Sequence, residues 1–285
     1  HIILPALIDL HTHIPQYPAI GIGKGTLLDW LEQQIFPLEK KFDDIEYAYN
    51  LSLKVFEESI KFGTATIVAY SNLGYESTNS SFEAAKDMNI KAYIGNALMD
   101  FNLAKNLNKT TDYNIEISNK LIKKWHSESG KLKYILTPRY ALVCSMKLMK
   151  WAAKISKENN IKIQTHLAEN KDELKEVNKL YKNISNYTEV YNQAGILHDN
   201  TLLAHGIYLN DDEVKIIQSK GANIVHCPSS NRYLQSGILP LINMKNIVPI
   251  GLGTDVGGGV SLSMINEMKE AIETSKTFNI TENIS

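Results

Sequence analysis

The hydrophobic positions of this chain fall into short runs that recur along its whole length. Eight runs rich in apolar and β-branched residues have the length of buried strands, at residues 2–10, 64–70, 91–98, 132–137, 161–166, 201–205, 222–226 and 248–253. Several intervening stretches carry the apolar stripe of an amphipathic helix, at residues 44–61, 146–158, 172–181, 211–219 and 263–275. Strands that alternate with helices predict a parallel sheet with crossover helices.

Eight strand–helix units within 285 residues match a closed (β/α)₈ barrel, so we expect an α/β protein of this type. A doubly wound open sheet is the alternative, although such a sheet seldom needs so many units. No internal repeat, low-complexity tract or linker interrupts the pattern. We therefore expect residues 1–285 to form one domain.

Composition narrows the function classes. With 44% hydrophobic and 21% charged residues and a formal net charge of −1, the chain is typical of a globular protein that recruits neither nucleic acid nor an anionic membrane. No apolar stretch approaches the ~20 residues that span a bilayer. Two cysteines, Cys144 and Cys227, give no disulfide framework and favour the cytoplasm. The chain opens at His1 on the edge of a predicted strand, so we expect a piece of a longer polypeptide.

Polar side chains suited to metal binding follow several of the predicted strands. His11 and His13 are two residues apart at the end of the first run, so they point to the same side of a strand. His166, His205 and Asp255 end the fifth, sixth and eighth runs. In a barrel these ends meet at one rim, where active sites lie. We therefore expect the five side chains to converge.

This set of residues suits catalytic zinc, which binds imidazole nitrogens and carboxylates and keeps one position open for water. We expect His11, His13, His166 and Asp255 to bind the metal. Zinc lowers the pKa of a bound water toward neutrality and so supplies a hydroxide nucleophile. Asp255 can also accept the proton of that water. His205 can either bind the metal or hydrogen-bond the water or a developing oxyanion.

Glu169 lies three residues after His166, just beyond the fifth strand. This position predicts an acid/base group that does not bind the metal. A single carboxyl can carry a proton to a leaving group such as ammonia, so the spacing points to hydrolytic deamination.

The order of these motifs resembles the amidohydrolase superfamily, with His-x-His after strand one, His after strands five and six, and Asp after strand eight. The His166-x-x-Glu169 pair resembles its mononuclear nucleobase deaminases. Within that group the chain is most similar to the guanine deaminase family, through the segments at residues 4–17, 137–140, 226–231 and 251–259. The family also carries a small β-sandwich built from sequence on both sides of the barrel, and neither flank is present here.

The resemblance implies hydrolysis of guanine by water to xanthine and ammonia in purine catabolism, with one zinc ion per subunit and ferrous iron as the alternative. Hydroxide would attack C2 of guanine, Glu169 would protonate N3 and later assist the departure of ammonia, and Asp255 would take the proton of the water. The metal and His205 would hold the tetrahedral centre. The resemblance leaves the oligomeric state open, with a homodimer as one candidate.

The resemblance also implies that Gln16 and Arg139 grip the base, in a site that Glu169 and His205 complete. The chemistry agrees, because Gln offers both a donor and an acceptor to a purine edge. Arg offers only donors, so it suits a keto oxygen such as O6 and disfavours a 6-amino group. Tyr140 is a further candidate that could stack on the base.

Three other functions are weighed against this one. A deaminase of cytosine, of adenosine-type compounds or of triazines would share the metal motif, but Gln16 and Arg139 argue against it. A two-metal hydrolase of cyclic amides would need a bridging lysine where this chain has Leu-Thr-Pro-Arg at residues 136–139. A non-catalytic scaffold would have lost metal ligands that this chain keeps. His226, after the seventh strand, fits a role beside the site better than a further ligand.

Overall fold

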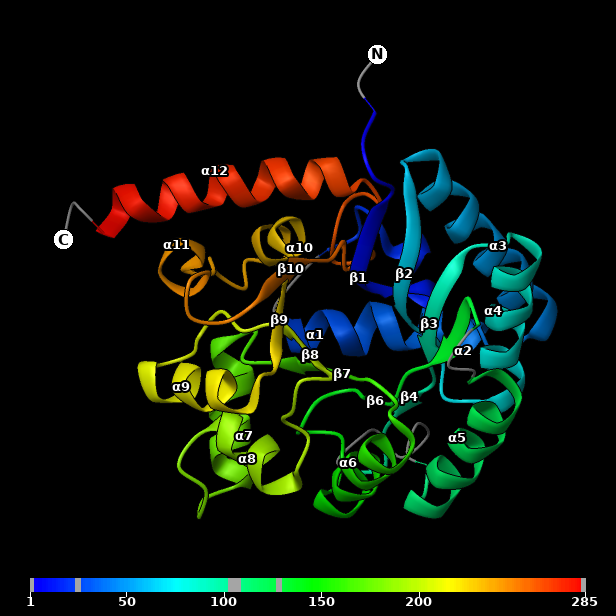
Figure 1. Cartoon of the computed structure of the whole chain (residues 1–285), viewed down its shortest axis with the longest axis horizontal. Helices are drawn as coiled ribbons and strands as arrows, with labels where there is room; N and C mark the ends of the chain where they lie inside the picture. The colour runs from blue at the N-terminus through cyan, green and yellow to red at the C-terminus, as the bar shows by residue number, and fades with distance from the viewer. Residues whose placement is uncertain (1–2, 24–26, 102–108, 127–129, 283–285) are drawn as a thin grey trace.

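The structure is a computed structural model that describes residues 3–23, 27–101, 109–126 and 130–282. Parallel strands lie at the centre and helices surround them (Figure 1). The strands are β1 (Leu7–His13), β2 (Thr64–Tyr70), β3 (Lys91–Gly95), β4 (Ala97–Leu98), β5 (Leu132–Tyr134), β6 (Thr137–Pro138), β7 (Ile163–Leu167), β8 (Thr201–His205), β9 (Asn223–His226) and β10 (Ile250–Leu252).

The strands follow one another in space in the order in which they occur along the chain. One parallel sheet has the order β1-β2-β3-β5, a second has the order β10-β9-β8-β7, and β4 pairs with β6. A bridge between Leu136 and Ile163 joins the two larger sheets on one side. On the other side, the Asp255 N–H donates to the His11 carbonyl at 2.7 Å. Within the described residues the two larger sheets are thus connected to each other at both edges. This is the α/β arrangement that the sequence predicts.

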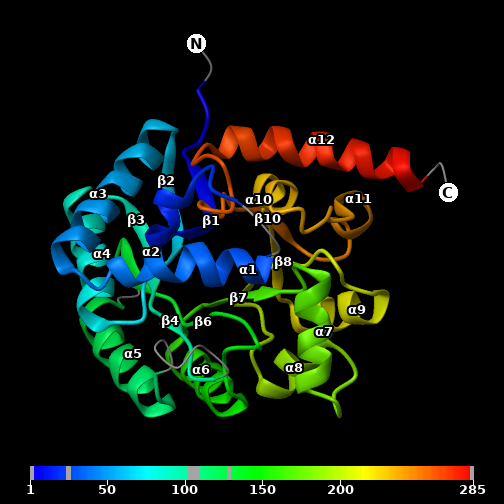
Figure 2. The ribbon, with the colours of Figure 1, turned by 180° about the vertical axis from the view of Figure 1, so that it is seen from behind.

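Helices cover the outside of the strands, as the views from both sides show (Figures 1 and 2). The α-helices of the first half are α1 (Leu27–Trp30), α2 (Phe36–Lys41), α3 (Ile45–Lys61), α4 (Tyr75–Asp87) and α5 (Thr111–Trp125). Those of the second half are α6 (Met146–Asn159), α7 (Lys171–Leu180), α8 (Tyr187–Ala194), α9 (Asp211–Lys220), α10 (Pro228–Tyr233), α11 (Leu241–Met244) and α12 (Met264–Glu282). A 3₁₀ helix, η1 (Ile14–Ala19), follows β1, and a π-helix, η2 (Leu31–Ile35), joins α1 to α2.

All eight predicted strand regions contain strands, and the third and fourth are each divided into two pieces. The first is shifted: we expected it at residues 2–10, and it begins at Leu7 and runs through His13. Residue 2 of the prediction lies outside the described residues. Ile3 and Leu4 lie before the strand with 95% and 64% of their surface exposed. Apolar character alone placed the strand too early, because pairing with β2 starts only at Leu7.

The five predicted helices are present as α3, α6, α7, α9 and α12, and helix caps explain several boundaries. The Asp44 side chain accepts a hydrogen bond from the Tyr47 N–H at the start of α3, and Ser145 caps α6 through the Leu148 N–H. The apolar stripe did not single out α4. Its buried face includes small residues such as Ser77, Ser81 and Ala84, which pack closely but add little to a hydrophobic pattern.

The main hydrophobic core lies between the strands and the ring of helices. It includes fully buried side chains from β2, β3 and β7 as well as from α3 and α6, such as Ile67, Ile94, Ile163, Phe56 and Leu148. This packing holds the strand ends in fixed positions. Among the described residues, no helix combines the length and the hydrophobicity that a membrane crossing requires.

Asp9 connects the first strand to the loop that follows the last one. Its Oδ1 accepts hydrogen bonds from the Thr254 N–H at 3.0 Å and the His11 N–H at 3.1 Å, and its Oδ2 accepts one from Thr254 Oγ1 at 2.5 Å. Burial raises the pKa of Asp9 to about 7, against hydrogen bonds from Thr254 that lower it. Gly253 allows the close approach, because a Cβ there would lie 2.6 Å from the His11 Cβ. One carboxyl therefore positions the backbone beside both His11 and Asp255.

We predict that Asp9→Ala lowers the free energy of unfolding by about 2–4 kcal/mol, because it leaves buried N–H and O–H donors without an acceptor. Urea denaturation measures the change. Asp211→Ala serves as the control, since it removes an exposed carboxylate from the first turn of α9 and should cost less than about 1 kcal/mol. Equal stability of the two variants would refute the connecting role of Asp9.

Candidate metal and substrate site

The five predicted metal-site side chains converge where the strands end. His13 Nε2 lies 3.2 Å from His166 Nε2 and 3.4 Å from Asp255 Oδ1. His11 Nε2 lies 3.2 Å from Asp255 Oδ1, and His205 Nε2 lies 3.9 Å from Asp255 Oδ2. The expected convergence at one rim is therefore present in the structure.

The geometry groups these residues slightly differently from the predicted ligand set. Candidate ligand atoms of His11, His166, His205 and Asp255 all lie within 4.8 Å of one another. His13 faces two members of this group, His166 and Asp255, and is itself buried. Each of the five side chains is thus close enough to contribute to one ion.

The backbone bends sharply at the ends of the strands that carry the site. Ala168, His205 and Asp255 have φ values of +50°, +73° and +47°, in the left-handed region that residues other than glycine seldom adopt. They are three of the six described non-glycine residues with positive φ. Such strain persists only where the surroundings hold it, and it concentrates at functional sites.

Hydrogen bonds behind the site fix the direction of three of these side chains. His166 Nδ1 lies 2.7 Å from the Arg139 carbonyl oxygen, and His205 Nδ1 lies 2.8 Å from Asn231 Oδ1. Ser230 Oγ donates to Asp255 Oδ2 at 2.6 Å. Because a ring nitrogen bonded to a carbonyl oxygen carries the proton, the opposite nitrogen of His166 offers a lone pair toward the centre.

The cluster has the properties that a divalent cation requires. Nε2 of His11 and Nε2 of His205 are buried, and no described residue forms a hydrogen bond of acceptable geometry with either atom. Burial lowers the pKa of His11, His13 and His166, which favours the neutral form of the ring that binds a metal. Imidazole nitrogens with one carboxylate form a donor set that suits zinc. The residues therefore fit the metal that the sequence implies.

Glu169 stands beside this cluster, on the loop after β7. Its Oε2 lies 3.4 Å from His205 Nε2, and its Oε1 accepts a hydrogen bond from Ser236 Oγ at 3.3 Å. Burial raises the pKa of Glu169 to about 7, although the nearby His205 opposes the change. The backbone N–H of Glu169 donates to Glu173 Oε2 at 2.9 Å, which fixes the loop. Glu169 is thus a buried carboxyl able to exchange a proton near neutral pH.

In His205 and Asp255, neighbouring groups outweigh the effect of burial on the pKa. Burial alone lowers the pKa of His205, but the charges of Glu169 and Asp255 outweigh it and the pKa is raised. Burial alone raises the pKa of Asp255, but the neighbouring histidines, His11 foremost, hold it well below its usual range. Asp255 is therefore ionised.

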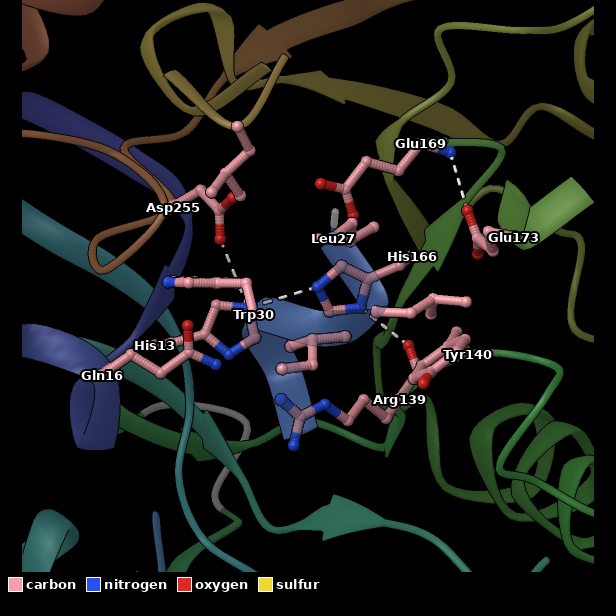
Figure 3. A pocket seen from close by; sticks show the side chains of 13 residues that line it. His13, Gln16, Leu27, Trp30, Arg139, Tyr140, His166, Glu169, Glu173 and Asp255 are labelled. Carbon is pink, nitrogen blue, oxygen red and sulfur yellow. Dashed lines mark hydrogen bonds and ion pairs between the residues drawn. The ribbon is translucent and has the colours of Figure 1, made fainter. Parts of the chain in front are cut away.

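A cavity next to the cluster also contains the residues expected to grip a base (Figure 3). Gln16, Arg139 and Tyr140 line it together with Glu169 and Asp255. The other lining residues are His13, Leu27, Leu28, Trp30, Leu31, His166, Glu173 and Leu234. The structure thus places the three predicted base contacts and the acid/base carboxyl around one space.

Several residues that line or support the cavity escaped the sequence analysis, among them Glu39, Trp30 and Glu173. Glu39 of α2 is buried against Gln16 and Arg139, whereas its position beside two lysines is typical of a surface helix. Trp30 has a buried indole N–H that finds no hydrogen-bond partner among the described residues. Glu173 is the third residue of the capping box at the start of α7, and nothing else in the sequence indicates that it also lines the cavity. His226 is buried and is not among the residues that line the cavity.

Comparisons with known proteins agree with this geometry. The chain is 34% identical over 281 residues to guanine deaminase of Rattus norvegicus. The match covers 97% of this chain and 62% of that protein. It is 34% identical over 275 residues to guanine deaminase of Escherichia coli K12, with 95% and 62% covered. The crystal structure of guanine deaminase from C. acetobutylicum with bound guanine superposes with a TM-score of 0.95 at 33% identity, covering 98% of this chain and 68% of that one.

The chain therefore spans about 62% of the length of these curated relatives. The family model described as "Amidohydrolase family" matches residues 2–283. Since that match extends over nearly the whole sequence, the chain belongs to the amidohydrolase family.

Proposed function

We propose that this chain carries the catalytic site of an enzyme that hydrolyses guanine to xanthine and ammonia. The observation that carries the proposal is the cavity in which the buried carboxyl of Glu169 faces the histidine–aspartate cluster on one side and Gln16 and Arg139 on the other. Similarity to guanine deaminases, one of them crystallised with guanine, supports the choice of substrate.

A single divalent ion would be held by His11, His13, His166 and Asp255, with His205 close enough to join them. Zinc suits this donor set, and ferrous iron is the alternative. When bound, such an ion lowers the pKa of water toward neutrality and supplies a nucleophile at neutral pH.

The chain's own residues would move the protons of the reaction. Ionised Asp255 accepts the proton of the attacking water. Glu169 protonates N3 of the base as C2 becomes tetrahedral. It then assists the departure of the amino group by taking the remaining proton of the attacking oxygen, while Asp255 passes its proton to that group, which leaves as ammonia. His205, whose raised pKa favours a charged ring, donates a hydrogen bond to the developing negative charge on oxygen.

The purine would lie across the cavity floor, with Arg139 donating to O6 and Gln16 meeting the neighbouring ring edge. Tyr140 lies in the same wall and offers an aromatic surface on which the base could stack. We also propose that residues 1–285 form one metal-dependent hydrolase domain of a longer chain. Its two buried free cysteines suit a reducing cytoplasm.

We predict that the full-length protein releases ammonia faster from guanine than from adenine, cytosine or guanosine when the four are assayed side by side. Against adenine, the physical reason is that Arg139 offers only donors, which match a keto oxygen and repel an amino group. Release of ammonia from cytosine or adenine, with none from guanine, would overturn the proposed substrate.

We predict that Glu169→Gln lowers kcat for guanine by about 100- to 10,000-fold, because the amide cannot shuttle a proton. Metal content, measured by elemental analysis, should stay at the wild-type level. Glu176→Gln is the matched control, since Glu176 is exposed on the neighbouring helix α7 and should keep wild-type kcat. A Glu169→Gln enzyme of normal rate would remove the acid/base role.

We predict that Asp255→Ala weakens metal binding by more than about 100-fold, because loss of a ligand should cost at least as much as loss of an outer partner. Competition with a chromogenic chelator measures the affinity. The exposed variant Asp211→Ala should bind metal like the wild type. Unchanged affinity in Asp255→Ala would exclude Asp255 as a ligand.

A further inference from the structure

Glu39 of α2 is a buried carboxylate that the proposed reaction does not use, yet it contacts both residues expected to read the base. Its Oε1 and Oε2 pair with the two terminal nitrogens of Arg139, at 2.9 Å and 2.7 Å. The same Oε1 accepts a hydrogen bond from Gln16 Nε2 at 3.0 Å. One side chain therefore joins η1, which follows β1, to the residue that follows β6.

The chain fixes the position of this carboxylate from several sides. Asn72, in the loop after β2, donates through Nδ2 to the Glu39 carbonyl at 3.1 Å and to Asp43 Oδ1 at 2.8 Å, which secures the end of α2. The Arg139 guanidinium lies 5.3 Å from the centre of the Phe36 ring, one turn earlier in the same helix. Burial alone lowers the pKa of Arg139, but the charge of Glu39 reverses the effect, so the pKa is raised and the guanidinium stays charged.

These contacts determine what Gln16 offers to a ligand. An amide has one donor end and one acceptor end, and the rest of the protein decides which end faces the cavity. Here Nε2 is committed to Glu39, which can only accept when ionised. The Gln16 Oε1 accepts no hydrogen bond from the described residues, so it is available to a ligand as an acceptor.

The contacts also determine what Arg139 offers. A guanidinium has five N–H donors, and the two bonds to Glu39 use one hydrogen on each terminal nitrogen. The remaining hydrogens can only donate. Both side chains line the same cavity, as Figure 3 shows. The cavity therefore presents donors from one residue and an acceptor from the other.

We propose that Glu39 is a positioning residue that sets this donor–acceptor pattern and thereby selects purines with a lactam edge, a ring C=O next to a ring N–H. Guanine has that edge at O6 and N1–H. In 2,6-diaminopurine the pattern is inverted, because an amino group replaces O6 and N1 becomes an acceptor. Both compounds keep the 2-amino group that the proposed reaction removes, so the inference rests on the proposed function and refines it.

The test compares wild-type and Glu39→Gln enzyme, as full-length proteins, with guanine and 2,6-diaminopurine. An amide at position 39 can donate a hydrogen bond to Gln16 as well as accept one, so the Gln16 side-chain amide can flip and exchange its oxygen and nitrogen. The negative charge beside Arg139 is also lost. We expect KM for guanine to rise about 10- to 100-fold, as for loss of charge-assisted hydrogen bonds. We expect kcat and metal content to change less than about threefold. The preference for guanine over 2,6-diaminopurine, as a ratio of kcat/KM values, should fall by at least about tenfold.

Two further variants separate positioning from simple structural support. Lys41→Gln, an exposed change on the same helix, should leave both substrates unaffected. Glu39→Asp keeps the charge beside Arg139 but is one methylene shorter, so it should remain folded and lose part of the guanine preference. That variant keeps the test informative if Glu39→Gln does not fold.

The outcomes distinguish this inference from the proposed function. A wild-type enzyme without activity on guanine would refute the proposed function. A wild-type enzyme active on guanine, with Glu39 variants that are folded and keep both KM and the guanine preference, would refute only the role of Glu39. A fall in kcat and metal content at constant preference would likewise reject positioning of the base contacts and indicate general structural support.

Discussion

Polar and ionisable side chains at the strand ends are removed from water, and the rest of the site depends on how the protein compensates for that loss. A buried charge without a partner is costly, so each such group must be paired or hydrogen-bonded. Asp9 receives donors from the loop after β10, and Arg139 is paired with Glu39. Glu173 accepts a hydrogen bond from Tyr187 at 2.8 Å. The same pairing that allows burial also fixes direction, so stability and preorganisation of the site have one origin.

Burial also prepares the chemistry before any ligand arrives. It lowers the pKa of three histidines, which leaves their nitrogens free to bind a cation, and it raises the pKa of Glu169 to about 7. The cluster around Asp255 keeps that carboxylate ionised although it is buried. Two carboxyls in one cavity are thereby driven apart in acidity, which is how one site provides both an acid and a base.

Much of the fold and of the histidine–aspartate cluster could be predicted, because side-chain alternation along a strand is local and the ends of parallel strands meet at one rim. His11 and His13 share one side of a strand, and the ends of β7, β8 and β10 had to meet them once the strands were parallel. The first strand was placed too early, since its boundary depends on pairing with β2 rather than on apolar character. Hydrophobic periodicity did not reveal helix α4, because close packing against α3 favours small residues. One of them is Ser81, which accepts a hydrogen bond from Ser52.

The sequence by itself determined the alternation of strands and helices, the residue types at each strand end and the spacing of Glu169 from His166. These features follow from local geometry, which a linear pattern records. Only the tertiary structure decided that Glu39 lies against Gln16 and Arg139, 23 and 100 residues away. It also decided which end of the Gln16 amide remains free. The physical reason is that a hydrogen-bond pattern in a buried site depends on every neighbour in space, and most of those neighbours are distant along the chain.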